Sequence, residues 1–200
     1  MKIAIIDYGA GNTQSVKYAL KRLGCKGVLT SDKEVISSSD RVIFPGVGQA
    51  SSAMRMLESK GLDLLIPELK QPVLGICLGM QLMCGFSEEG NTNCLKIFDS
   101  NVKRFDNSFK VPQIGWNTVF DLKTSLFNSI IENEYMYLVH SYYVPLITST
   151  VATSNYGINY STAIKKNNFI GVQFHPEKSG SKGELAVSYT HLTLPTNREV

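Results

Sequence analysis

The stretch VLGICLGMQLM, residues 73–83, joins an apolar run to a glycine-containing turn and then to a second apolar pattern. Residues 73–76 predict a buried strand, and Leu78, Leu82 and Met83 begin a helix directly behind it. A strand followed at once by a helix is typical of parallel sheets, whose crossover connections need a dozen or more residues. The stretch therefore indicates an α/β fold.

Two earlier segments repeat this pattern. Residues 2–8 form an apolar run that ends at a glycine-rich turn, and helical spacing follows until Gly24. Residues 41–44 form another run, which stops at Pro45-Gly46-Val47-Gly48 before a helix expected around residues 53–57. In open parallel sheets, ligands bind beyond the carboxyl ends of the strands, so we expect the function to lie in these turns.

The second half of the chain is richer in strands. We expect them at residues 102–105, 118–122, 135–139, 151–154 and 169–174, separated by Gly, Asn and Ser turns. The sequence therefore predicts one three-layer α/β domain with a central mixed, mostly parallel sheet.

The composition excludes several classes of protein. With 43% hydrophobic and 18% charged residues, the 200-residue chain is not disordered, and its net charge of +3 gives no reason to expect a nucleic-acid partner. No apolar run approaches the roughly 20 residues of a membrane span. The four cysteines form no CxxC pair, so we predict no metal site, no disulfide framework, no cofactor and a cytoplasmic location.

Cys77 stands at the centre of Gly75-Ile76-Cys77-Leu78-Gly79, where the predicted strand turns into the helix. The glycines permit a strained nucleophile elbow in which sulfur replaces the serine oxygen. There the helix N-terminus favours the thiolate, and the backbone N–H of Leu78 is directed at a developing oxyanion. From this stretch alone, a small buried core cysteine is an equal alternative.

A second motif ends an apolar strand with a histidine and, two residues later, a carboxylate: Gln173-Phe174-His175-Pro176-Glu177-Lys178. This spacing suits an imidazole that faces a thiolate while the carboxylate holds its other ring nitrogen. A surface histidine beside a solvated glutamate is the alternative. Together the two motifs predict a nucleophile, a base and an orienting acid: Cys77, His175 and Glu177.

The two motifs resemble the class I glutamine amidotransferase family, whose domains carry G-x-C-x-G and a late H-P-E. Residues 75–81 and 175–178 are similar to the glutaminase subunits of imidazole glycerol phosphate synthases, and the similarity extends over residues 1 to about 186. The resemblance implies a flavodoxin-like fold and hydrolysis of glutamine to glutamate and ammonia by the triad. It also implies a heterodimer with a (β/α)8 cyclase subunit that uses the ammonia to make imidazole glycerol phosphate and AICAR in histidine biosynthesis.

The same resemblance assigns residues around the triad. Pro45-Gly46-Val47-Gly48 is similar to the family's P-G-V-G strand, where a peptide flip can turn the N–H of Val47 toward the oxyanion, with Leu78 as the second donor. Residues implied to bind L-glutamine are Gly46, Gly48, Gln81, Glu89, Ser141 and Tyr142, with Glu88 as the neighbouring alternative to Glu89. Residues implied at the partner interface are Asn12, Trp116, Tyr137 and Lys178.

Two other functions stay open on the sequence. A glutaminase that serves pyridoxal phosphate or cell-surface sugar biosynthesis would carry the same triad. A nucleotide-binding module could use Gly9 and Gly11, with Asp32 at the distance of a ribose contact, although Gln14 occupies the place of the third glycine.

Two further expectations concern His140 and the end of the chain. His140 ends an apolar strand but has no carboxylate comparable to Glu177, so we expect a structural role for it. Residues 1–186 are expected to form the amidotransferase domain with a truncated final helix. Residues 187–200, which lack helical periodicity, are expected to be a non-native tail.

Overall fold

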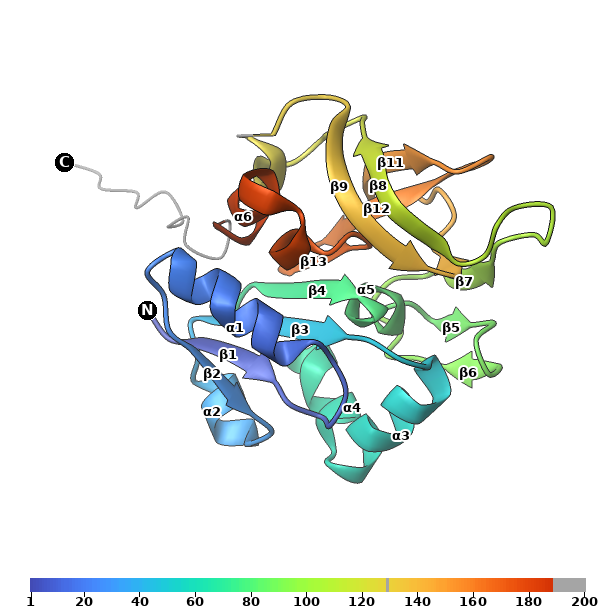
Figure 1. Ribbon diagram of the computed structural model, residues 1–200. Helices are drawn as coiled ribbons and strands as arrows, with labels where there is room; N and C mark the ends of the chain where they lie inside the picture. The colour runs from blue at the N-terminus through green and yellow to red at the C-terminus, as the bar shows by residue number, and fades with distance from the viewer. Residues whose placement is uncertain (129, 189–200) are drawn as a thin grey trace.

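A seven-stranded mixed sheet forms the centre of the computed structural model, which describes residues 1–128 and 130–188 (Figure 1). Its strand order is β11-β12-β13-β4-β3-β1-β2. The neighbours from β13 to β2 pair in parallel, whereas β12 pairs antiparallel with β13 and with β11. The strands are β1 (Ile3–Ile6), β2 (Gly27–Thr30), β3 (Arg41–Gly46), β4 (Val73–Cys77), β11 (Thr150–Asn155), β12 (Asn159–Lys166) and β13 (Phe169–Val172).

Two smaller sheets complete the strands in the described part of the chain. One has the order β10-β7-β5-β6, and the other is the antiparallel pair of β8 and β9. Their strands are β5 (Phe86–Ser87), β6 (Thr92–Asn93), β7 (Asn101–Arg104), β8 (Gln113–Val119), β9 (Glu134–His140) and β10 (Tyr142–Tyr143).

The helices follow the strands closely in sequence. The α-helices are α1 (Thr13–Arg22), α2 (Lys33–Ser37), α3 (Ala50–Ser59), α4 (Leu62–Leu65), α5 (Leu78–Leu82) and α6 (Gly180–Ser188). Three single turns of 3-10 helix are η1 (Ile66–Glu68), η2 (Ser125–Phe127) and η3 (Pro176–Lys178). None of the helices in residues 1–128 and 130–188 combines the length and the hydropathy needed to cross a membrane.

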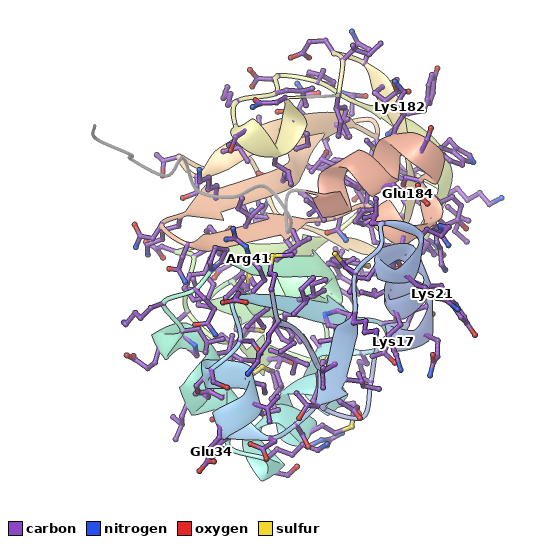
Figure 2. The ribbon with its side chains drawn as sticks, turned by 90° about the vertical axis from the view of Figure 1, so that its left-hand side faces the viewer. Lys17, Lys21, Glu34, Arg41, Lys182 and Glu184 are labelled. Carbon is purple, nitrogen blue, oxygen red and sulfur yellow. The ribbon has the colours of Figure 1, made fainter. Side chains whose placement is uncertain are left out.

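Two hydrophobic clusters, one on each face of the central sheet, define three layers. On one face, Leu57 of α3 and Leu62 of α4 pack in the cluster that contains Phe44 of β3. On the other face, Leu20 of α1 shares a cluster with Met136 of β9. The outer layer on this second face is therefore built partly from the β8–β9 pair, beside α1 and α6 (Figure 1). Figure 2 shows Glu184 of α6 near α1, and Arg22 of α1 forms an ion pair with it.

The predicted α/β class and the mixed, mostly parallel sheet are confirmed. The strand expected at residues 118–122 is wrong, because β8 begins at Gln113 and ends at Val119. Asp121 has a φ of 58°, a left-handed conformation that a strand cannot contain. Strands β2 and β12 were not predicted. Helix α6 extends two residues past the expected domain end, and residues 189–200 of the expected tail lie outside the described residues.

Candidate active site

The site lies where the parallel strands end. Strands β1, β3 and β4 point to the same side of the molecule (Figure 1), so the chain that leaves each of them emerges at one edge of the sheet. A cavity of about 290 Å³ opens at this edge. Its lining includes the following residues singled out in the sequence: Val47, Gly48, Cys77, Leu78, Gln81, Glu89, Ser141, Tyr142 and His175. Gly46 and Glu177 are buried and do not belong to this lining.

Cys77 occupies a sharp turn between β4 and α5. Its φ of 54° and ψ of −110° place a non-glycine residue in a sparsely populated conformation, which marks a strained position. The close approach of β3 to this turn requires glycine, because a Cβ on Gly79 would overlap the carbonyl oxygen of Phe44. The elbow geometry expected from the sequence is therefore present, with the thiol at the cavity.

His175 and Glu177 form a buried pair beside Cys77. Nδ1 of His175 lies 2.8 Å from Oε1 of Glu177, and the two side chains are 2% and 1% exposed. Burial lowers the pKa of His175, but the sulfur of Cys77 and the carboxylate of Glu177 outweigh it and raise the pKa to about 10. The histidine is thus held as an imidazolium at neutral pH.

The second ring nitrogen of His175 is available to the thiol. Among the described residues, Nε2 makes no hydrogen bond within ordinary distance and angle limits. Since Glu177 takes Nδ1, Cys77 interacts with the ring through Nε2. The structure therefore brings the three predicted triad residues together in the order thiol, imidazole, carboxylate.

The backbone of His175 is tied to β9. Its N–H donates to the carbonyl of Tyr137 over 2.9 Å, and its carbonyl accepts from Oγ of Ser179 over 2.7 Å. The same Oγ accepts from the N–H of Tyr137 over 2.9 Å. These bonds fix the position of the imidazole relative to the β8–β9 pair.

Glu89, rather than Glu88, reaches the cavity. Oε2 of Glu89 accepts from the backbone N–H of Ala50 over 2.9 Å, whereas Glu88 accepts from the N–H of Arg104 and does not line the cavity. Burial raises the pKa of Glu89, against the smaller lowering effect of the Ala50 N–H. A partly buried carboxylate at this point is suited to pair with an ammonium group.

Gln81 has both amide hydrogens in use. Nε2 donates to the carbonyl of Tyr142 and to Oε1 of Gln173, each over 2.9 Å. A ligand in the cavity can therefore meet only the acceptor end of Gln81, its Oε1 atom.

His140 lines the cavity but is engaged by its own surroundings. Nδ1 lies 2.7 Å from the carbonyl of Tyr142, which can only accept, so Nδ1 carries the proton. Burial lowers the pKa of His140 to about 4, although the Tyr142 carbonyl raises it and His175 lowers it further. A neutral, anchored imidazole fits the expected structural role.

Three of the four residues expected at a partner interface lie together on the outer face of the β8–β9 pair. Trp116 pairs with Tyr137 across the strands, and their rings meet edge to face at 6.0 Å. Nζ of Lys178 lies 5.9 Å from the centre of the Tyr137 ring. Trp116 is 56% exposed. Asn12 lies apart, at the start of α1, where its side chain does not cap the helix.

Two residues without a predicted role contact the reacting segments. The hydroxyl of Tyr8, which is buried, donates to the carbonyl of Pro45 over 3.0 Å and so anchors the residue before Gly46. Nε2 of Gln173 lies 3.6 Å from Sγ of Cys77. A fully buried glutamine at the end of an apolar strand is the signal that could have identified Gln173.

The nucleotide-binding alternative receives no support from Asp32. Its Oδ1 accepts from the N–H groups of Glu34 and Val35 and so caps α2. In the part of the chain that the structure describes, no three His, Cys, Asp or Glu side chains gather as they do around a metal ion.

Comparison with known proteins gives consistent results. Residues 4–192 match the family model described as glutamine amidotransferase class-I. The chain is 57% identical over 190 residues to the imidazole glycerol phosphate synthase subunit HisH of Bacteroides fragilis strain YCH46, covering 94% of this chain and 97% of the relative. It is 50% identical over 187 residues to the HisH subunit of Haemophilus influenzae strain Rd, covering 92% and 94% of the two chains.

Solved structures share the fold at low sequence identity. A GMP synthase subunit from Thermoplasma acidophilum matches with a TM-score of 0.73 at 19% identity, covering 96% of this chain and 92% of that one. The structure of PurLQS from Thermotoga maritima matches with a TM-score of 0.71 at 16% identity, covering 94% and 96%. At these identities the likeness concerns the fold alone.

Proposed function

The chain belongs to the class I glutamine amidotransferase family, and from this membership we propose how its site hydrolyses glutamine and what receives the ammonia. It is the glutaminase subunit of an imidazole glycerol phosphate synthase, an enzyme of histidine biosynthesis, as its HisH relatives at 50–57% identity indicate. The observation that carries the mechanism is the buried His175–Glu177 pair, whose second ring nitrogen is left to Cys77 at the cavity.

In the first half of the reaction, the Cys77 thiolate attacks the side-chain amide carbon of glutamine. The imidazolium of His175 stabilises the thiolate by charge and hydrogen bonding. The carbonyl oxygen becomes an oxyanion, and the backbone N–H groups of Val47 and Leu78 are the proposed donors to it. Leu78 begins α5, so its N–H has no partner within the helix and is free for this role.

His175 then acts as the general acid. It transfers its Nε2 proton to the amide nitrogen as the carbon–nitrogen bond breaks, which releases ammonia and leaves a glutamyl thioester on Cys77. The neutral imidazole next takes a proton from water, whose oxygen attacks the thioester. Glutamate leaves and the thiolate–imidazolium pair is restored. Glu177 keeps Nδ1 protonated throughout, so Nε2 is the nitrogen that exchanges the proton.

The remaining cavity residues are suited to hold the amino-acid end of glutamine. We assign the ammonium group to Glu89, whose partly buried carboxylate gains a counter-ion there. Ser141 and Tyr142 lie on the same wall and are proposed to order the substrate carboxylate, with Gly46 and Gly48 shaping the opposite wall. Gln81 contributes only its acceptor oxygen, because its amide hydrogens are already used.

We propose that the outer face of the β8–β9 pair docks the (β/α)8 cyclase subunit in a heterodimer. Ile114, Trp116 and Tyr135 are exposed on this pair, and exposed aromatic residues are frequent anchors of interfaces. Tyr137 and Lys178 lie beside them, with Asn12 proposed to contact the same partner. His175 is bonded to the backbone of Tyr137, so docking there is transmitted directly to the catalytic base.

A reducing cytoplasm remains our proposal for where the protein works, since the nucleophile must stay a free thiol. The proposed function is tested by reconstituting the complex with its cyclase and supplying either glutamine or an ammonium salt. Cys77→Ser should abolish product formation from glutamine while leaving formation from ammonia intact. Undiminished formation from glutamine would overturn the proposal, and loss of both would place the defect in assembly of the complex, contrary to a purely chemical role for Cys77.

A further inference from the structure

Gln173 is buried directly behind the nucleophile. It follows β13 in sequence, is fully buried, and its backbone N–H donates to the carbonyl of Thr162 over 2.8 Å. Its side-chain Nε2 lies 3.6 Å from Sγ of Cys77, within the distance expected for an N–H group that donates to sulfur. A buried amide in contact with the reacting atom is chemistry that the triad alone does not explain.

The surrounding hydrogen bonds fix which end of the Gln173 amide faces the sulfur. The carbonyl oxygen of Tyr142 can only accept, so the group of Gln81 that meets it must be the NH₂ group. That NH₂ group also meets Gln173, which must therefore present its oxygen. The NH₂ group of Gln173 is left to point at Cys77. The reversed amide would set two buried NH₂ groups against each other, which native proteins avoid.

We propose that Gln173 is a further catalytic residue of this site, whose amide N–H donates a hydrogen bond to the Cys77 thiolate, with its orientation set by Gln81 and the carbonyl of Tyr142. This inference rests on the proposed glutaminase function. A thiol at Cys77 can instead donate to the carbonyl of Val139, which lies 3.9 Å from Sγ. The two neighbours thus favour opposite protonation states of the sulfur.

An amide is well suited to this position because it does not titrate. It stabilises the anion without offering a proton, so His175 remains the group that protonates ammonia. Gln81 consequently acts on the nucleophile as a positioning residue, in addition to any contact of its oxygen with substrate. The segment that carries Tyr142 is in this way connected to the thiolate through two amides.

The test compares Gln173→Met with Gln113→Met. Gln113 is also a buried glutamine, bonded through Oε1 to the hydroxyl of Tyr160, but no contact joins it to Cys77 in the described structure. The full-length chain is alkylated with iodoacetamide over a range of pH, and modification of Cys77 is followed by peptide mass spectrometry. Glutaminase kinetics are measured on the complex with the cyclase.

For Gln173→Met we expect the pH of half-maximal alkylation to rise by about one unit and kcat to fall roughly ten- to a hundredfold, with a much smaller change in KM. Gln113→Met should leave the alkylation profile where it is in the wild type. An unchanged profile and kcat in a folded Gln173→Met protein would overturn the inference.

If Gln173→Met does not fold, Gln173→Glu decides the question. It keeps the size of the side chain and an acceptor for Gln81 but places carboxylate oxygen at the sulfur, so the alkylation midpoint should rise. A midpoint equal to that of the wild type would contradict the proposal. Failure of the proposed function is distinguishable, because it would appear as glutaminase activity retained by Cys77→Ser, whatever Gln173 does.

Discussion

Replacing Glu177 with glutamine tests the electrostatic role of the buried pair. The substitution keeps the shape of the side chain and can keep an acceptor near Nδ1 of His175, but it removes the negative charge. With the charges roughly 4 Å apart and an effective dielectric constant of about 20, the lost attraction is about 4 kcal/mol. Oε2 of Glu177 has no partner in the described structure, so the new NH₂ group would also be buried unsatisfied.

An energy of about 4 kcal/mol corresponds to about a thousandfold in rate if it is lost entirely from the transition state. Because the remaining hydrogen bond preserves part of the orientation, we expect kcat for Glu177→Gln to fall roughly a hundred- to a thousandfold. The pKa of His175 should also fall, since Glu177 is one of the groups that raise it.

The assay is glutamate release by the complex with the cyclase, measured from pH 6 to pH 10 together with NMR titration of the His175 ring. Glu184→Gln, on the partly exposed ion pair with Arg22, serves as the control for removal of a carboxylate. If Glu177→Gln keeps more than half of the wild-type kcat and the His175 titration does not move, the assignment of Glu177 is wrong.

Three more predictions concern the fold and the interface. Between pH 7 and pH 4 the unfolded chain protonates His140 while the folded chain does not, because its pKa is lowered to about 4, so this group removes about 3 kcal/mol of unfolding free energy as the pH falls. His140→Asn should flatten that loss in urea titrations, and parallel curves would contradict the pKa. Gly79→Ala should lower the melting temperature by roughly 5–10 °C, since its Cβ overlaps the Phe44 carbonyl, and an unchanged melting temperature would refute that contact. Trp116→Ala should weaken cyclase binding in calorimetry by about 2 kcal/mol or more, and undiminished affinity would exclude this face.

The elbow and the H-P-E turn could be predicted from sequence because their local rules agree with the tertiary structure. The apolar run at residues 73–76 is buried on both faces of a parallel sheet, and the glycines around Cys77 are required by the approach of β3. The chemistry of Cys77 and His175 then depends on the ends of neighbouring strands, which parallel pairing brings together.

Other features depend on contacts that the sequence does not display. Strand β8 has an exposed face that carries Trp116, so it lacks the continuous apolar run of a buried strand. Strand β12 buries Ser161 and Thr162, which are typical of turns in a linear pattern. The contact between Gln173 and Cys77 joins residues 96 positions apart, and its direction depends on Gln81 and a backbone carbonyl.

The central claim is that Cys77 is the nucleophile of a glutaminase, and the most direct measurement is glutamate release by the wild type and Cys77→Ser, each with and without the cyclase. We predict that the wild type releases glutamate in the complex and that Cys77→Ser releases it at least about a thousandfold more slowly under the same conditions. Equal rates of glutamate release from the two proteins would contradict the account.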